Sequence, residues 1–179
     1  MTHRRILVAG IGNIFSGDDA FGVAVAERMW QRPQVPDVRV HDFGIRGLDL
    51  AYSLLEGFEV VILVDACPRG EAPGTLFVIE PKIDSKEEVD AHPDLIDAHG
   101  MDPVKMLRLA ASLGAPRGRI LLVGCEPHPP DASDFSMEMS PPVAAAVDRA
   151  VAVIDEMIAD FRQEWGAAGA AATLESSSA

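Results

Sequence analysis

Short apolar blocks alternate with longer amphipathic blocks along the chain, a pattern that predicts strands connected by helices. Ile6–Ala9 and Val60–Val64 are continuously apolar, as expected for strands buried on both faces of a sheet. Shorter runs predict three more strands, at Val38–His41, Gly74–Ile79 and Ile120–Val123. The connections between these strands then decide the fold class.

Helical periodicity and end signals predict four helices. Ala20–Trp30 places Phe21, Val25 and Met29 four residues apart on one face, and Leu48–Leu55 is a short apolar helix. The third helix is predicted to start at the N-cap Asp102 with Pro103 in its first turn and to end at Gly114. The fourth is predicted to start at the N-cap Ser140, followed by Pro141.

This order predicts a single three-layer α/β/α domain over residues 1–165, with a mostly parallel sheet. The short connection after Val60–Val64 favours an antiparallel hairpin with Gly74–Ile79, which would supply one antiparallel strand. The polar, acidic segment Pro81–Asp97 is predicted to be a long surface loop. Residues 166–179 lack a core-forming pattern and are expected to form a disordered tail.

Composition and charge narrow the classes of partner. The 179-residue chain carries 28 acidic against 15 basic residues, a net charge of −13. Nucleic acids and anionic membranes are recognised through basic faces, so neither is expected as a partner. No apolar run reaches the roughly 20 residues of a membrane span. Two cysteines without a secretory signal predict a reducing, cytoplasmic location.

The run from Gly10 to Asp19 carries the most chemical information. It follows the first predicted strand and reads Gly-Ile-Gly-Asn-Ile-Phe-Ser-Gly-Asp-Asp. Glycine-rich turns at this place commonly hold phosphates, but two adjacent carboxylates would repel a phosphate. Phe15 occupies the position where a dinucleotide fingerprint needs its third glycine, so no nucleotide cofactor is expected. A cation suits this turn better.

Other acidic residues and a histidine follow later elements. Asp42 and Asp65 each stand directly after a predicted strand, and His99 lies just past the long polar loop. Ligands of open α/β sheets bind at the carboxyl ends of the strands, so these residues and Asp19 are expected at one edge. Aspartate oxygens and a histidine nitrogen suit an open metal site.

Each of these residues also has a structural interpretation. Asp18 is expected to have a cap or loop role at the first helix, which leaves Asp19 for the site. Cys67 and Cys125 are most simply small buried residues, although either could pair with His99 as a nucleophile without a supporting motif. The functional interpretation rests on the fact that several such residues follow separate strands and are expected to meet at one edge of the sheet.

Several motifs, taken in order, resemble those of the [NiFe]-hydrogenase maturation endopeptidases. They are Gly10-Ile11-Gly12-Asn13 with Gly17-Asp18-Asp19-Ala20-Phe21-Gly22, Val64-Asp65-Ala66 with Pro73-Gly74-Thr75, His99-Gly100-Met101, Leu122-Val123-Gly124-Cys125-Glu126-Pro127, and Met139-Ser140-Pro141-Pro142-Val143. The resemblance implies an α/β/α domain with a twisted five-stranded sheet. It also implies a cytoplasmic endopeptidase that removes the C-terminal extension of a hydrogenase large-subunit precursor after nickel insertion.

The same resemblance assigns roles to residues. The metal-contacting trio of the family falls on Asp19, Asp65 and His99, and its acidic residue after the second strand falls on Asp42. These four are the expected catalytic residues, with the nickel supplied by the precursor. Water activation is left open between the metal and a carboxylate such as Asp42 or Asp19. A monomer is expected.

The chain departs from the family pattern after the second strand. Many members continue there as Gly-Gly-Thr-x-Gly, whereas this chain has Phe43-Gly44-Ile45-Arg46-Gly47, with Arg46 available to meet a carboxylate of the extension. An alternative function remains, a non-catalytic nickel-sensing chaperone of the same precursor, which would use the same residues.

Overall fold

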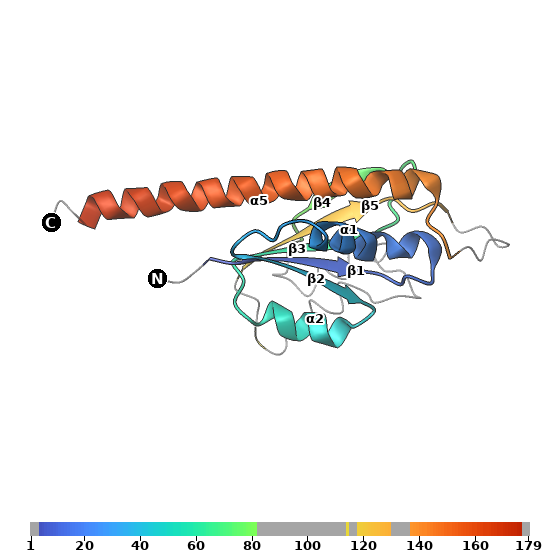
Figure 1. The fold of residues 1–179 in the computed structure, drawn as a ribbon, viewed down its shortest axis with the longest axis horizontal. Coiled ribbons are helices and arrows are strands. Elements are labelled where there is room, and N and C mark those ends of the chain that lie inside the picture. Colours follow the sequence, from blue (N-terminus) through green and yellow to red (C-terminus); the bar gives the residue numbers. More distant parts are fainter. Residues whose placement is uncertain (1–3, 82–113, 115–117, 130–136, 177–179) are drawn as a thin grey trace.

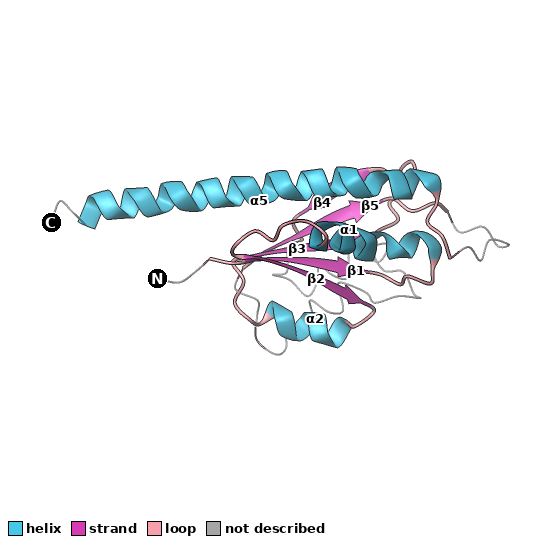
Figure 2. Ribbon diagram, viewed as in Figure 1, coloured by secondary structure: helices cyan, strands magenta, loops and turns pink. Residues whose placement is uncertain are grey.

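A computed structural model describes residues 4–81, 114, 118–129 and 137–176, which form a sheet between two layers of helices (Figure 1). Helices α1 and α5 cover one face and α2 lies on the other (Figure 2). The strands are β1 (Ile6–Ile11), β2 (Val38–Gly44), β3 (Val60–Ala66), β4 (Leu76–Ile79) and β5 (Arg119–Cys125). The helices are the 3-10 helix η1 (Gly17–Ala20), α1 (Phe21–Trp30), α2 (Gly47–Leu54) and α5 (Pro141–Ser176). The predicted three-layer α/β/α class is confirmed.

The five strands lie in the order β2-β1-β3-β5-β4, and every neighbouring pair is parallel except β5 and β4. A mostly parallel sheet with one antiparallel strand is therefore confirmed. The predicted hairpin is wrong, because β4 pairs with β5 instead of β3. β4 has four residues, none of them buried, which suits the edge of the sheet, while β5 lies between β3 and β4.

Apolar side chains fill both faces of the sheet. On one face Val8 of β1 and Ile62 of β3 belong to a core that includes Ile154 of α5. On the other face Leu63 of β3 belongs to a second core with Leu50 of α2. β1 is buried along its whole length and β3 up to its last residue, as the continuous apolar runs predicted.

Helix α5 begins as predicted and ends later than predicted. It starts at Pro141, and the carbonyl of Ser140 accepts the N–H of Ala144 (2.9 Å). In place of the expected disordered tail from residue 166, the helix continues to Ser176, past the end of the sheet (Figure 1). Alanine has the highest intrinsic helix propensity, and the run after Gly166 is rich in alanine.

Two predicted segments cannot be compared with the structure. The helix between Asp102 and Gly114, and the polar loop beyond Pro81, lie outside the described residues except for Gly114 and Pro81 themselves. Within the described part of the chain, no helix is both long and apolar enough to cross a membrane.

Candidate functional site

The carboxyl ends of β1, β2, β3 and β5 share one edge of the sheet because these strands are parallel. Near the end of β1, Gly10 pairs with Asp42 of β2 on one side and with Val64 of β3 on the other. Asp65 is the next residue of β3. Two predicted site residues, Asp42 and Asp65, therefore lie on the two strands that flank β1.

The loop after β1 folds back over this edge. Gly12 has a φ of +134°, and a Cβ atom there would lie 1.8 Å from the carbonyl oxygen of Asp19. Ser16 donates its N–H to the carbonyl of Asn13 (3.0 Å), and Asp19 donates its N–H to the carbonyl of Ser16 (3.0 Å). Gly12 also donates to the carbonyl of Gly44 at the end of β2 (3.1 Å). Glycine at position 12 thus lets the chain return Asp19 to the strand ends.

Asp19 and Asp65 approach the same buried thiol. Asp19 is half-buried, and its Oδ2 accepts the N–H of Asn13 (2.9 Å). Asp65 is only 6% exposed, and its Oδ1 accepts the N–H of Ala66 (2.8 Å). Burial and the charges of Asp65 and, to a smaller extent, Asp19 raise the pKa of Cys67 well above its ordinary value. Both carboxylates therefore act on this thiol through their charge, Asp65 more strongly than Asp19.

Gly22 allows α1 to approach the strand ends backbone to backbone. A Cβ atom at Gly22 would lie 2.1 Å from the carbonyl oxygen of Val64 and 2.2 Å from that of Ile11. A Cβ atom at Gly10 would lie 2.4 Å from the carbonyl oxygen of Gly22. This contact seats η1, which carries Asp19, against the edge of the sheet. Sequence reasoning missed Gly22, although a glycine inside a helical pattern costs about 1 kcal/mol and so points to a close approach.

Asp18 does not cap the first helix, and of the cap or loop role expected for it the structure shows the loop role. The chain enters α1 through η1, which places Asp18 inside a helical turn instead of before one. Its carboxylate accepts three hydrogen bonds from distant segments. Oδ1 accepts the N–H of Ser140 (2.6 Å), and Oδ2 accepts the Ser140 hydroxyl (2.9 Å) and the N–H of His128 (2.7 Å). Asp18 thus ties the loop after β1 to the loop after β5 and to the start of α5.

We expect Asp18→Asn to lower the free energy of unfolding by about 2 kcal/mol. The side-chain NH₂ of the asparagine would face one of the N–H or O–H groups of Ser140 or His128, which would then lack an acceptor. Thermal unfolding followed by circular dichroism measures this loss. Ser140→Ala is the matched control. It removes one hydrogen bond and keeps both backbone donors, so its loss should be about 1 kcal/mol. Equal stability of wild type and Asp18→Asn would contradict the role of Asp18 as a tie.

Glu126 fastens the loop that follows β3. Glu126 is 5% exposed, and its carboxylate accepts the N–H groups of Arg69 (2.6 Å) and Gly70 (3.1 Å). The Glu126 backbone also accepts from Gly74 (2.8 Å) and donates to Thr75 (2.9 Å). The connection from β3 to β4 is therefore attached to the end of β5, which fixes the backbone next to the site.

The two cysteines are protonated at neutral pH. Both are buried and neither forms a disulfide. Burial and the charge of Asp18 raise the pKa of Cys125 to about 11, with Arg149 acting in the opposite direction. A cysteine nucleophile needs a lowered pKa, so Cys67 and Cys125 do not suit that role. The simpler interpretation of both as small buried residues fits the structure.

The free energy of unfolding should consequently decrease as pH rises from about 9 to 11. Below pH 9.0 Cys125 is neutral in both states, whereas above it the unfolded chain ionises first and the folded chain keeps its proton up to about pH 11. Each such thiol then removes about 1.4 kcal/mol per pH unit. Urea unfolding at several pH values measures the slope, which should be shallower in Cys125→Ala. Identical slopes in the two proteins would contradict this account.

Asp42 is exposed at the end of β2, where Arg46 braces the backbone around it. The Arg46 guanidinium donates to the carbonyl oxygens of Asp42 and Phe43, the latter at 3.1 Å. The Arg46 backbone N–H also donates to the carbonyl of Phe43 (2.8 Å). The sequence hypothesis had Arg46 meeting a substrate carboxylate, whereas in the structure its guanidinium holds the end of β2.

Among the described residues, no three His, Cys, Asp or Glu side chains form a group that could hold a metal ion. His99, the third member of the predicted trio, lies outside the described residues. The structure thus places three of the predicted residues at the carboxyl end of the sheet, with Asp42 on β2, Asp65 on β3 and Asp19 on η1. The contribution of His99 stays a prediction.

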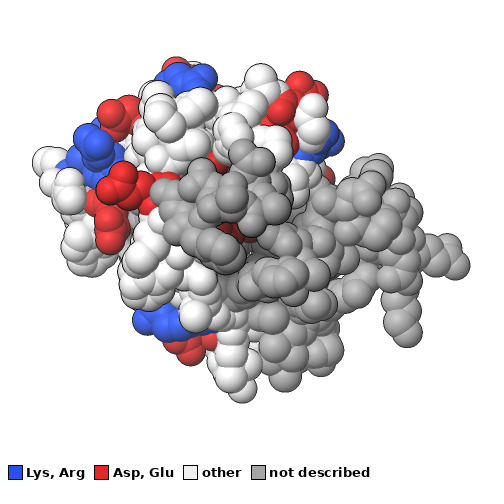
Figure 3. Space-filling view, turned by 90° about the vertical axis from the view of Figure 1, so that its right-hand side faces the viewer, with Lys and Arg blue, Asp and Glu red and all other residues white. Residues whose placement is uncertain are grey.

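Charged side chains of both signs occur around this edge. Figure 3 looks onto the carboxyl ends of the strands, and its described part shows red carboxylates and blue basic groups among white uncharged surface. The net charge of −13 over the whole chain favours cationic or neutral guests.

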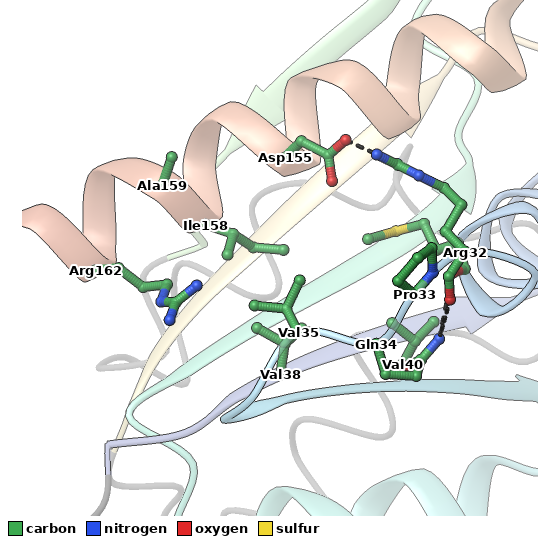
Figure 4. A pocket seen from close by; sticks show the side chains of 11 residues that line it. Arg32, Pro33, Gln34, Val35, Val38, Val40, Asp155, Ile158, Ala159 and Arg162 are labelled. Carbon is green, nitrogen blue, oxygen red and sulfur yellow. Dashed lines mark hydrogen bonds and ion pairs between the residues drawn. The ribbon is translucent and has the colours of Figure 1, made fainter.

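A separate pocket of about 400 Å³ lies between the connection from α1 to β2 and helix α5 (Figure 4). Its lining is mainly apolar, including Val38 and Ile158, and it also contains the ion pair of Arg32 with Asp155 (2.7 Å). Val38 is the first residue of β2, at the end opposite to the carboxylates. This pocket is therefore not part of the candidate site.

Comparison with known proteins shows which protein family this chain resembles. The family model for hydrogenase maturation proteases matches residues 23–157. The hydrogenase expression/formation protein HoxM of Azotobacter vinelandii is 33% identical over 165 residues, which cover 89% of this chain and 75% of the relative. The hydrogenase 2 maturation protease of Escherichia coli is 28% identical over 161 residues, or 89% of this chain and 92% of the relative.

Solved structures of the same class have a similar fold. The hydrogenase maturating endopeptidase HybD from E. coli superimposes with a TM-score of 0.68 at 26% identity, covering 89% of this chain and 93% of the other. The [NiFe] hydrogenase maturation protease HycI from Thermococcus kodakarensis gives a TM-score of 0.66 at 27% identity, covering 85% and 90%.

Proposed function

Because this chain belongs to the hydrogenase maturation protease family and is a peptidase, we propose that it removes the C-terminal extension of a [NiFe]-hydrogenase large-subunit precursor after nickel insertion. The observation that carries the proposal is that Asp65, near the end of β3, and Asp19, on the 3-10 helix η1 that packs against β3, are placed at the same edge of the sheet. In a family that matures hydrogenases, this pair of carboxylates is a natural recognition element for a bound cation.

The nickel belongs to the substrate in this proposal. Asp19, Asp65 and His99 contact nickel that the precursor already holds, and they supply the oxygen and nitrogen ligands that a divalent transition metal accepts. Without the metal, the carboxylates at this edge repel each other and an arriving peptide meets no attraction. Nickel in the precursor therefore acts as the signal for docking, and no nucleotide takes part.

Asp42 is the carboxylate that we assign to water activation. Its side chain is exposed on the strand next to β1, and no hydrogen bond to its carboxylate occurs within the described residues. Asp19, by contrast, uses one oxygen to hold the backbone of Asn13. A free carboxylate beside the metal contacts can take a proton from the attacking water, while the nickel polarises the scissile carbonyl.

The rest of the molecule is compatible with a cytoplasmic enzyme that works as a monomer. Both cysteines are free and buried, in keeping with a reducing compartment. We expect neither nucleic acid nor membrane as a partner, because the net charge of −13 opposes anionic surfaces.

Peptidase and chaperone activities on this client can be separated by one experiment. Purified nickel-loaded precursor is incubated with the protein, and the mass of the large subunit is measured over time. The proposal expects a shortened subunit and a released C-terminal peptide in equal amounts. A stable complex in which the subunit keeps its full mass would instead assign the chain to the nickel-sensing chaperone role.

A further inference from the structure

We propose that exposed apolar side chains beside the carboxylates dock an apolar, non-acidic segment of the large-subunit precursor that lies next to the cleavage site. This inference rests on the proposed function and specifies which surface meets the substrate. The surface, here called the apolar rim, consists of Ile14, Phe15, Ile45, Leu48 and Tyr52.

Exposure of large hydrophobic residues is concentrated in the apolar rim. Its five members make up more than half of the nine large hydrophobic residues that are exposed in the described part of the chain, and each is between 52% and 68% exposed. Isolated exposed apolar residues are common on soluble proteins, whereas a group of them marks an interaction site. The distribution therefore points to a docking surface at this edge.

The members of the apolar rim lie on adjacent connections. Ile11 pairs with Gly44 where β1 and β2 end, and Ile14 and Phe15 follow the first strand while Ile45 follows the second. Leu48 and Tyr52 are one helical turn apart on α2, so they share a face. The apolar rim thus runs from the carboxylates outward along α2.

Hydrogen bonds hold the apolar rim in its exposed position. Phe15 donates its N–H to Oδ1 of Asn13 (3.0 Å), and the N–H of Asn13 is bound by Asp19 (2.9 Å). The loop that presents Phe15 is therefore attached to a site carboxylate. Arg46 braces the strand end next to Ile45 in the same way. Covering these exposed Phe and Ile side chains removes apolar surface from water, which favours binding of a partner.

The charges nearby select the chemistry of the partner. Asp42 and Asp49 are exposed on the same stretch of chain, and the guanidinium of Arg46 is engaged by backbone carbonyls. An acidic segment would be repelled, whereas neutral or basic apolar residues would be accepted. A second copy of this chain fits less well, because each copy has a net charge of −13.

The test compares two double variants in steady-state processing of nickel-loaded precursor. Phe15→Ser with Ile45→Ser removes two members of the apolar rim. Trp30→Ser with Val78→Ser is the matched control, because both residues are exposed (65% and 48%) on other elements. We expect the rim variant to raise KM about tenfold or more with a much smaller change in kcat, and the control to keep KM within about twofold. Equal KM values for the two variants would overturn the proposal.

Direct binding separates failure of this inference from failure of the proposed function. Titration calorimetry measures the affinity of each variant for the same precursor, whether or not cleavage follows. Tight binding by the wild type without cleavage would refute the peptidase assignment on this client, and weaker binding by the rim variant would still support the docking surface. Equal binding by the rim variant and the control overturns the docking surface. A wild type that neither binds nor cleaves overturns both.

Discussion

Asp19→Ala is expected to reduce processing of nickel-loaded precursor by a factor on the order of a hundred or more, the scale seen when a group that acts on the reacting complex is removed. The variant loses one of the two carboxylates that raise the pKa of Cys67 and that lie at the carboxyl end of the sheet. It also loses the acceptor for the N–H of Asn13, which shapes the loop after β1. The measurement is the rate of large-subunit shortening, with circular dichroism to show that the fold is retained.

Two further variants separate the charge of Asp19 from its structural role. Asp19→Asn keeps an oxygen that can accept the N–H of Asn13, so it should fold normally and still lose most of its activity. Asp160→Ala removes an exposed carboxylate on α5 and should process precursor at the wild-type rate. Wild-type activity in Asp19→Asn would show that the carboxylate serves the loop alone. His99→Ala is expected to behave like Asp19→Asn, as the third member of the trio.

Gly22→Ala is expected to destabilise the protein by about 3 kcal/mol, the upper part of the range for overpacking, and to disable the site. The added methyl group would lie 2.1 Å and 2.2 Å from two backbone oxygens, those of Val64 and Ile11, which cannot rotate away as a flexible side chain could. The start of α1 must lift from the sheet, and η1 with Asp19 must move with it. Thermal unfolding should show a decrease in Tm of about 10 °C.

Gly166→Ala is the matched control for this substitution. It makes the same change in a helix, α5, at a position where nothing lies within 4 Å of the new methyl group. Because alanine favours helix by about 1 kcal/mol over glycine, this variant should be as stable as wild type or more so. A Gly22→Ala protein with wild-type Tm and activity would show that the contact between α1 and the strand ends is not needed.

The strands and the fold class could be predicted because burial on both faces leaves a continuous apolar run. β1 and β3 were recognisable from Ile6 and Val60 onward for this reason. Their ends were placed too early, since Asp65 belongs to β3 although a carboxylate does not look like a strand residue. The partner of β4 was predicted wrongly. A short loop after β3 indicates that the next strand runs antiparallel to it, but it does not indicate which strand of the sheet that next strand pairs with.

The candidate site was predictable in position and only partly in detail. Parallel strands bring their carboxyl ends to one edge, so Asp42 and Asp65 could be placed there from sequence. The tie made by Asp18 could not, because its partners His128 and Ser140 are more than a hundred residues away in the chain. A glycine inside a helical pattern indicates a close approach at Gly22, but the sequence does not tell which backbone atoms it meets, because they belong to two strands that the fold brings together.

Nickel-dependent cleavage is the central claim, and the intact mass of the large subunit tests it most directly. Precursor prepared with and without nickel is incubated with the wild-type protein, and the mass of each sample is measured at equal times. We predict that the nickel-loaded precursor loses its C-terminal extension while the nickel-free precursor keeps its full mass. Equal shortening of both precursors, or shortening of neither, would contradict the account.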